Sequence, residues 1–188
     1  TKGKQVITAE IENSSSFKLS NKEFDINASC QYGELSYESD NENVVSVDSS
    51  GHAVINGAGR AKIKVTAPAI YNYAKTVKTF NITVRPDTVK ISSLTGTAKT
   101  ATVSWEHDAE AAGYQIRYSL KSNMKNSKVC SVRKSLAKKK LRGLKSNTKY
   151  YVQVRSYVKT DDGSKIYSSW SDKKNIKTKK VKTEKKKS

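Results

Sequence analysis

Residues 141–157, with the sequence LRGLKSNTKYYVQVRSY, constrain the fold of this chain more than any other stretch. After a short polar turn, the side chains alternate in character at every position from Tyr150 onward. A period of two, carried by aromatic and β-branched residues, indicates a β-strand with one buried face. We therefore expect one set of side chains to point into a core and the other to point outward. The inward set is Tyr150, Val152, Val154 and Ser156, and the outward set is Tyr151, Gln153, Arg155 and Tyr157.

The same alternation recurs along the chain. The other predicted inward sets are Ala61, Ile63 and Val65, then Phe80, Ile82 and Val84, then Ala101, Val103 and Trp105, and finally Tyr114, Ile116 and Tyr118. No segment longer than a turn or two has the 3.6-residue period of a helix. No apolar run approaches the roughly 18 to 20 residues that cross a bilayer. The pattern predicts an all-β chain without a membrane span.

The second half of the chain resembles a known family of β-sandwiches. Tyr150 follows a Leu-led turn that begins at Leu144, and this arrangement resembles the tyrosine corner of Ig-like sandwiches. Upstream, Trp105 occupies a core position, and a Gly-Tyr-x-Ile-x-Tyr strand begins at Gly113. Together these features resemble the fibronectin type III family over roughly residues 86–178.

The first half resembles a bacterial Ig-like domain of the group 2 type over roughly residues 5–84. That family carries an aromatic residue followed closely by Ser and Asp, a Val-x-x-Val hairpin closed by Gly, and a Gly-x-Gly-x-Ala-x-Ile segment. The matching residues are Tyr37, Ser39, Asp40, Val44, Val47, Gly51, Gly57, Gly59, Ala61 and Ile63. The resemblance implies a second sandwich, and it implies a bacterial source.

The segment Arg85-Pro86-Asp87 is the predicted boundary, because a proline after a closing strand cannot donate to a ladder and stiffens the connection. We expect a bacterial Ig-like domain at residues 1–85, a fibronectin type III domain at 86–178 and a Lys-rich tail at 179–188. The predicted fold class is therefore all-β, with two tandem Ig-like sandwiches, a short linker and a basic C-terminal tail.

The formal net charge of +19 is concentrated in the second half of the chain. Residues 1–86 carry a net charge of +1, whereas residues 87–188 carry +18. The densest part outside the tail is Arg133, Lys134, Lys138, Lys139, Lys140 and Arg142. A field this one-sided attracts polyanions. We expect an anionic cell-wall polymer rather than a specific nucleic acid, because no groove-reading helix is predicted.

No motif predicts catalysis, a cofactor or a metal. His52 and His107 lie in predicted turns without a recognised spacing to a nucleophile or carboxylate. Cys30 and Cys130, a hundred residues apart, make neither a disulfide framework nor a metal site, and we expect both to be small buried side chains. A group of carboxylates near one hairpin is interpreted as a solvated rim rather than a calcium site, because the spacing does not match an EF-hand. These carboxylates are Glu38, Asp40, Glu42 and Asp48.

Two aromatic segments leave alternatives open. The segment Tyr167-Ser168-Ser169-Trp170-Ser171 resembles the Trp-Ser-x-Trp-Ser box of cytokine-receptor fibronectin domains, in which aromatic rings stack with arginines. Its rings either brace the sheet by stacking with Arg117 and Arg155, or form a sugar platform from Tyr151, Tyr157 and Trp170 with Arg155 as a hydrogen-bond donor. The loop residues Tyr71 and Tyr73 suit either ligand contact or a lid over one end of the sandwich.

Both resemblances imply a secreted or cell-surface protein, with a Gram-positive bacterium as the expected source. We predict a non-catalytic accessory or spacer module that associates electrostatically with anionic wall polymer. The alternative is an adhesin or carbohydrate-binding module that takes a host or dietary glycan, or a protein, on the aromatic and Arg face. A third hypothesis is a fragment of an enzyme whose catalytic domain lies upstream and is missing from this sequence. The chain is expected to be a monomeric part of a larger multidomain protein.

Overall fold

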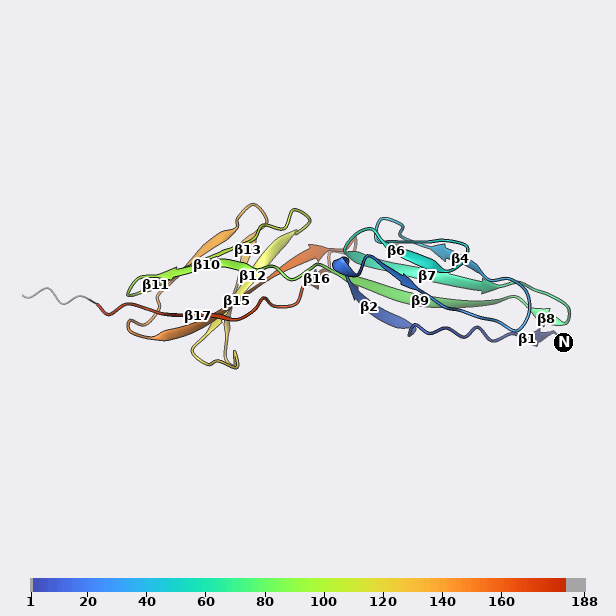
Figure 1. Ribbon diagram of the computed structural model, residues 1–188, viewed down its shortest axis with the longest axis horizontal. Helices are drawn as coiled ribbons and strands as arrows, with labels where there is room; N and C mark the ends of the chain where they lie inside the picture. Colours follow the sequence, from blue (N-terminus) through green and yellow to red (C-terminus); the bar gives the residue numbers. More distant parts are fainter. Residues whose placement is uncertain (1, 182–188) are drawn as a thin grey trace, which may run out of the picture. The chain divides into compact units, whose positions relative to one another are not determined.

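The computed structural model describes residues 2–181 and divides the chain into two compact units (Figure 1). The first is built on the residues up to Asp87, and the second on those from Thr88 onward apart from the hairpin segment Lys159–Ile166. Each unit is a β-sandwich, so the predicted all-β fold is confirmed. The predicted tail lies outside the described residues from residue 182 onward.

The first unit packs a four-stranded sheet against a three-stranded one. The larger sheet has the order β2 (Ser14–Lys18), β9 (Thr76–Arg85), β7 (Gly59–Ala67), β4 (Ser36–Ser39). The smaller has the order β3 (Glu23–Asp25), β6 (His52–Ile55), β5 (Val45–Val47), with the 3₁₀ turn η1 (Leu19–Asn21) between β2 and β3. β2 pairs with β9 in parallel, and the other pairs within these sheets are antiparallel. A short parallel pair, β1 (Gly3–Lys4) with β8 (Tyr73–Ala74), lies at one end.

The core of the first unit follows the predicted alternation. Ile63 on β7 lies opposite Phe80 on β9, and both are fully buried. All six predicted inward side chains of these two strands are buried, and each of the five larger ones, Ala61 excepted, contributes about 1.5–3 kcal/mol relative to exposure. The structure also explains the Gly-x-Gly segment: a Cβ on Gly59 would lie 2.5 Å from the Val44 side chain. Glycine there allows β7 to pass close to the smaller sheet.

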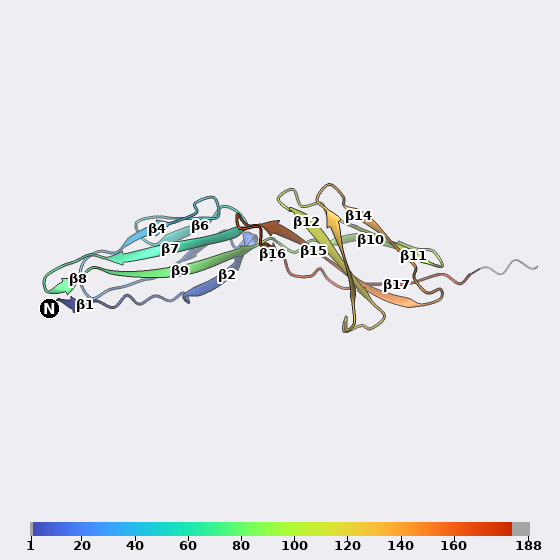
Figure 2. The same cartoon turned by 180° about the vertical axis from the view of Figure 1, so that it is seen from behind.

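The second unit has a three-stranded sheet and a five-stranded sheet (Figures 1 and 2). The first has the order β10 (Ile91–Gly96), β11 (Thr100–Trp105), β14 (Lys138–Arg142). The second has the order β13 (Lys128–Arg133), β12 (Gly113–Ser119), β15 (Lys149–Lys159), β16 (Lys165–Tyr167), and β17 (Lys174–Lys177) also pairs with β15.

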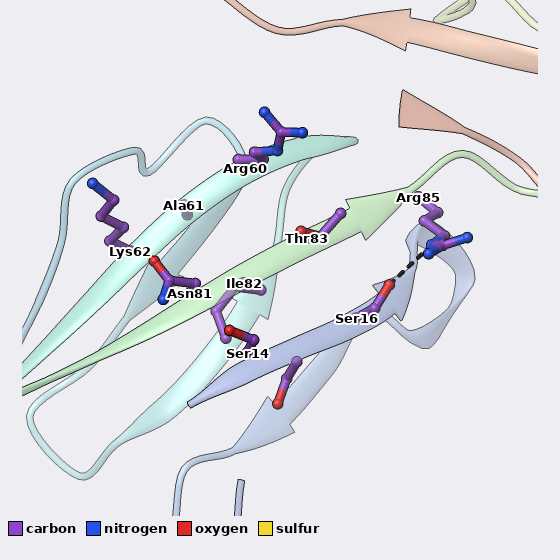
Figure 3. Close-up of a pocket in the computed structure, with 10 residues that line it drawn as sticks. Ser14, Ser16, Arg60, Ala61, Lys62, Asn81, Ile82, Thr83 and Arg85 are labelled. Carbon is purple, nitrogen blue, oxygen red and sulfur yellow. Dashed lines mark hydrogen bonds between the residues drawn. The ribbon is translucent and has the colours of Figure 1, made fainter. Parts of the chain in front are cut away.

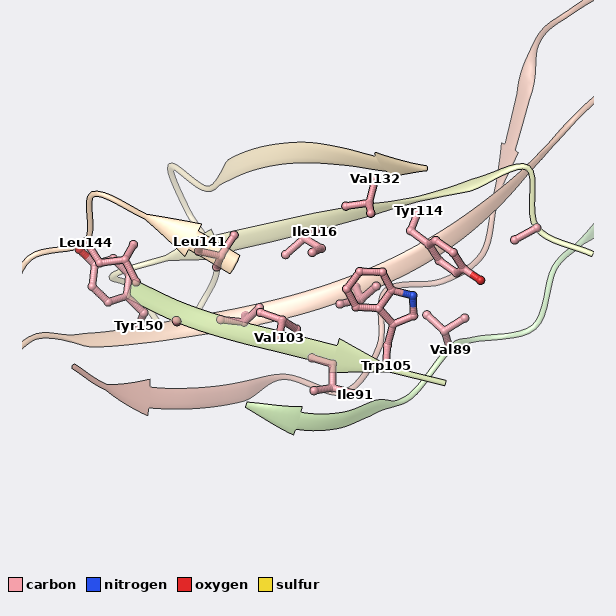
Figure 4. Packing of buried hydrophobic residues seen from close by; sticks show 14 residues of the cluster. Val89, Ile91, Val103, Trp105, Tyr114, Ile116, Val132, Leu141, Leu144 and Tyr150 are labelled. Atoms are coloured by element: carbon pink, nitrogen blue, oxygen red, sulfur yellow. The ribbon is translucent and has the colours of Figure 1, made fainter. Parts of the chain in front are cut away.

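The core of the second unit centres on Trp105 and Tyr114, whose ring centroids are 5.3 Å apart (Figure 4). Tyr150 packs at the other end of this core, and its hydroxyl oxygen accepts a 2.9 Å hydrogen bond from the backbone N–H of Lys145. This bond is the tyrosine corner that the sequence predicted. The bond holds the turn before β15 against the start of that strand, where the alternation of buried and outward side chains begins.

Candidate functional site

The outward face of the β12–β15 pair carries both arginines named from the sequence. The strand register places Gln115 opposite Arg155 and Arg117 opposite Gln153. Arg155 donates from Nε and Nη2 to Gln115 Oε1 at 3.0 and 2.7 Å, and Arg117 makes the same pair of bonds to Gln153 Oε1 at 3.0 and 2.7 Å. These two pairs of bonds fix both guanidinium groups on the outward face of the sheet.

Two aromatic rings lie against the guanidinium groups: Tyr167 at the end of β16, and Trp170 in the segment that follows. Arg155 Cζ is 3.8 Å from the ring centroid of Tyr167 and 4.3 Å from that of Trp170, while Arg117 Cζ is 4.4 Å from Trp170. The result is an alternating ladder in the order Tyr167, Arg155, Trp170, Arg117. Each contact is worth about 0.5–2 kcal/mol, depending on how far water is excluded.

Burial under the rings lowers the pKa of Arg117 and of Arg155, because desolvation disfavours the charged form. A guanidinium group is nevertheless not deprotonated in proteins. The ladder therefore places two positive charges on the sheet, each with donors directed at a glutamine and a face covered by an aromatic ring.

Two serines hold the ladder segment beside β15. Ser168 Oγ accepts a 3.0 Å bond from the backbone N–H of Ser156, and Ser171 Oγ accepts one of 3.0 Å from that of Val154. Their own backbone N–H groups donate back to the carbonyls of Ser156 and Val154, at 3.0 and 2.8 Å. Both serines are almost fully buried. They bond the segment to the sheet edge in place of a regular strand, and the sequence interpretation, which considered only the rings, missed this role.

The two other platform tyrosines lie in different surroundings. Tyr151 stays on the outward face, partly exposed, with the Nζ atoms of Lys149 and Lys173 at 5.3 and 5.7 Å from its ring centroid. Tyr157, expected outward, is only 8% exposed. Its register partner on the neighbouring strand β12 is Gly113, where a Cβ would lie 2.5 Å from the Tyr157 hydroxyl. The tyrosine ring folds over the space that the glycine leaves.

This arrangement favours the bracing interpretation of the ladder. Trp170 contacts two guanidinium groups, Tyr167 contacts one, and Tyr157 is buried. Tyr151 lies next to the ladder and is also partly exposed.

The basic cluster takes a defined form on β14, the edge strand of the three-stranded sheet. Its outward side chains Lys138, Lys140 and Arg142 pair across from Ser104, Thr102 and Thr100 of β11. No Asp or Glu occupies any position of β10, β11 or β14. Lys138, Lys139, Lys140 and Arg142 are exposed, and among residues 2–181 none of them forms an ion pair. The result is a row of cations beside hydroxyl groups.

Three of the four clustered carboxylates in the first unit, Glu38, Asp40 and Asp48, bind neighbouring groups within the fold. Glu38 pairs with Lys64 at 3.0 Å, and Asp40 accepts a 2.6 Å bond from the backbone N–H of Lys62. A hydrogen bond from the Ser50 hydroxyl is the main reason that the pKa of Asp48 is lowered. Within the described range 2–181, no three His, Cys, Asp or Glu side chains come together in an arrangement that could hold a metal ion.

His52 forms a local ion pair. Its Nδ1 lies 2.8 Å from Asp25 Oδ1, and Glu23 is 3.8 Å away from the other ring nitrogen. The hydrogen bond to Asp25 raises the pKa of His52 above its ordinary value of 6.5. His52 is the first residue of β6, where the sequence predicted a turn, and its contact with Asp25 links β6 to β3.

Cys30 and Cys130 are free thiols and only half-buried. Cys130 lies on β13, an edge strand that nothing in its own sheet covers on one side, so the expected full burial is not reached. Partial burial still raises the pKa of the Cys130 thiol.

A shallow groove of about 410 Å³ crosses the outward face of the four-stranded sheet (Figure 3). It is lined by the hydroxyl and amide groups of Ser16, Asn81 and Thr83 and by the cations Lys62 and Arg85, and Arg85 Nε donates to Ser16 Oγ at 3.0 Å. The sequence interpretation missed this surface because the first half is almost neutral in total. The signal was present in the alternation Arg60-Ala61-Lys62-Ile63-Lys64, which puts every second residue outward as a cation.

Two family models match the chain. Residues 20–69 match the immunoglobulin-like domain of intimin, and residues 84–173 match the fibronectin type III domain. The chain carries an intimin-type bacterial Ig-like domain followed by a fibronectin type III domain. The predicted order of a bacterial Ig-like domain and a fibronectin type III domain is thereby confirmed, and the Ig-like match is to the intimin type.

Three solved structures are among those that resemble the chain. The chicken CNTN1 FN1-FN3 domains are 20% identical, with a TM-score of 0.44 over 70% of this chain and 46% of that one, so the match spans under half of the CNTN1 fragment. A structure titled "Myokine structure" is 22% identical, with a TM-score of 0.41 over 50% of this chain and 99% of that one. The sixth fibronectin type III domain of human fibronectin type III domain containing protein 3 is 19% identical, with a TM-score of 0.42 over 54% and 93%. No curated protein sequence matches the chain.

The two domain types are typical of extracellular or surface proteins, and they are generally non-catalytic. Within residues 2–181, no helix has the length and apolar character needed to cross a bilayer.

Proposed function

We propose that the chain is a non-catalytic accessory or spacer module of a secreted or cell-surface protein of a Gram-positive bacterium, and that it associates electrostatically with anionic cell-wall polymer. The observation that carries this proposal is the exposed row Lys138, Lys140 and Arg142 on β14 of the fibronectin type III domain.

The geometry of β14 suits an extended polyanion. Alternate residues of a strand are about 6.7 Å apart, so the three outward cations span roughly 13 Å along one line. Neighbouring charges in this row lie within the Debye length of about 8 Å at physiological ionic strength, and they attract one chain jointly. Because the strand pairs with hydroxyl side chains and no carboxylate, nothing within the three strands neutralises it.

The test is co-sedimentation with purified Gram-positive cell wall, using a chain that ends at Val181. Truncation must leave Thr178 in place, because its hydroxyl accepts from the Thr148 N–H at 2.9 Å and donates to the Lys145 carbonyl at 2.6 Å. The variant Lys138→Gln/Lys140→Gln/Arg142→Gln removes the row. The matched control Lys121→Gln/Lys125→Gln/Lys128→Gln removes the same charge from the same domain.

We expect the chain that ends at Val181, without substitutions, to sediment with the wall at 50 mM salt. Much less of it should sediment at 300 mM salt, because the higher salt concentration screens the attraction between exposed charges. The β14 variant should bind at least fivefold more weakly, and the control less than twofold. Equal losses in both variants would contradict a role for β14. Binding that persists at 300 mM salt and disappears with Tyr151→Ala would instead support the alternative, a carbohydrate-binding or adhesive aromatic face.

A further inference from the structure

One end of the Ig-like domain is assembled from three separate segments. The N-terminal strand β1 pairs in parallel with β8, and the backbone N–H of Gly3 donates to the Asn72 carbonyl at 2.7 Å. The third segment is the loop at residues 30–34. Together with residues 68–74, it carries three tyrosines to the surface: Tyr32, Tyr71 and Tyr73.

A buried glutamine joins these segments. Gln5, directly after β1, is only 2% exposed. Its Nε2 donates to the Pro68 carbonyl at 2.8 Å, and its Oε1 accepts from the backbone N–H of Tyr32 at 3.1 Å. A buried amide with both ends bonded is costly to displace. The two tyrosine-bearing loops are therefore held in one arrangement by a side chain that lies beneath them.

The three rings form a contiguous cluster on this support. The centroid of Tyr32 lies 4.8 Å from that of Tyr73 and 6.1 Å from that of Tyr71, with the second pair edge to face. The Tyr32 hydroxyl also accepts a 3.3 Å bond from Gln31 Nε2. Tyr71 is 79% exposed, so it is no lid over the core.

The backbone at Tyr71 adopts the left-handed region, with φ of +51°. That region costs a side chain with a Cβ roughly 1–2 kcal/mol, and a bulky aromatic residue is uncommon there. Strained positions of this kind persist where the surrounding structure determines them, and they cluster at ligand-binding sites. The exposed ring of Tyr71 adds nothing to the core, so the strained backbone at this position indicates a role in binding.

We propose that Tyr32, Tyr71 and Tyr73 form a binding site for an uncharged polysaccharide chain. Flat rings suit the apolar faces of pyranose sugars, and the exposed amides of Gln31 and Asn72 can bond to the surrounding hydroxyl groups. The segments SCQYGE and PAIYNYA contain one charged residue between them, Glu34, so the cluster offers no clamp for a polyanion.

The size of the cluster distinguishes a sugar from a protein partner. One largely exposed ring and two partly exposed ones offer on the order of 250 Å² of aromatic surface. A stable protein interface needs about 800 Å² on each side. The pre-formed loops favour a small ligand, because little ordering free energy is lost on binding.

The test is a titration of the whole, ¹⁵N-labelled chain with cellohexaose, xylohexaose and chitohexaose in separate NMR experiments at 300 mM NaCl. The variant Tyr71→Asn removes the exposed ring, and asparagine tolerates the positive φ. The matched control Val77→Asn replaces an exposed apolar side chain on β9 of the same domain, outside the cluster. Unchanged spectra elsewhere in the chain verify that each variant folds.

At least one of the three oligosaccharides should shift the amide signals of residues 30–33 and 70–73. The Tyr71→Asn variant should bind that oligosaccharide at least tenfold more weakly, and the affinity of Val77→Asn should change less than twofold. The proposal is overturned if none of the three shifts these signals at 10 mM, or if Tyr71→Asn binds as tightly as the wild type. Signals that move with protein concentration and not with sugar would assign the cluster to a second copy of the chain, which also overturns it.

Discussion

Replacing Ser171 by alanine tests whether serine side chains hold the ladder segment to the sheet. Ser171 is 2% exposed, and its Oγ accepts the backbone N–H of Val154 at 3.0 Å while donating to the Asp172 carbonyl at 3.0 Å. Alanine fits the same space, so the substitution opens no large cavity. It leaves the buried N–H of Val154 without that acceptor.

An unsatisfied buried donor costs about 1–3 kcal/mol. Ser168→Ala removes the equivalent acceptor from the N–H of Ser156. We therefore expect each variant to lower the free energy of unfolding of the fibronectin type III domain by about 2 kcal/mol. The control is Ser169→Ala, between the two, at an exposed position where surface substitutions usually change stability by less than about 0.5 kcal/mol.

The assay is urea unfolding followed by tryptophan fluorescence. Both tryptophans of the chain, Trp105 and Trp170, belong to the fibronectin type III domain, so the signal reports on that domain. With a denaturant dependence of about 1–3 kcal/mol per molar for a small domain, 2 kcal/mol moves the midpoint by roughly 1 M. A midpoint for Ser171→Ala that coincides with that of Ser169→Ala would refute the argument that the hydroxyl serves as a strand partner.

Three further outcomes follow from the geometry. Arg155→Ala removes two cation–π contacts and two hydrogen bonds. It should therefore destabilise the fibronectin type III domain by about 2 kcal/mol in the same assay and shift the Trp170 emission to longer wavelength. An unchanged unfolding midpoint and emission spectrum would contradict the ladder. The pKa of His52 is raised, so its contribution to stability is complete below about pH 6.5 and is lost as the pH rises through the folded-state pKa. An NMR titration of the His52 ring protons should therefore give a lower pKa in Asp25→Asn, and an unchanged pKa would count against that hydrogen bond. Burial raises the pKa of the Cys130 thiol, so iodoacetamide should alkylate it at pH 8 at least tenfold more slowly in the folded chain than in urea, as followed by peptide mass spectrometry; equal rates would show the thiolate to be accessible.

The strands and the core could be predicted from the sequence because the period of two in side-chain character determines both. A residue such as Val152 or Ile63 is buried because a strand with a period of two must bury one face, and its neighbours in sequence suffice to establish that period. The tyrosine corner at Tyr150 was predictable for the same reason, since the Leu-led turn and the tyrosine are five or six residues apart.

The parts that the sequence interpretation missed depend on contacts between distant residues. The burial of Tyr157 follows from a glycine at position 113 on the neighbouring strand, which no local pattern around the tyrosine reveals. The role of Ser168 and Ser171 depends on β15 lying beside them. In the same way, Gln5 resembles any surface amide in the sequence, and only the approach of Pro68 and the Tyr32 loop makes it a buried link.

The serine contacts at β15 also affect whether another chain can add to this edge of the sheet. A strand edge with free N–H and C=O groups is a template onto which another chain can add, and this addition leads to aggregation. At Val154 and Ser156 both kinds of group are already engaged by Ser171 and Ser168. An incoming strand would therefore have to displace a segment that is also fixed through Trp170, and this part of the sheet is protected from edge-to-edge association without proline or an added strand.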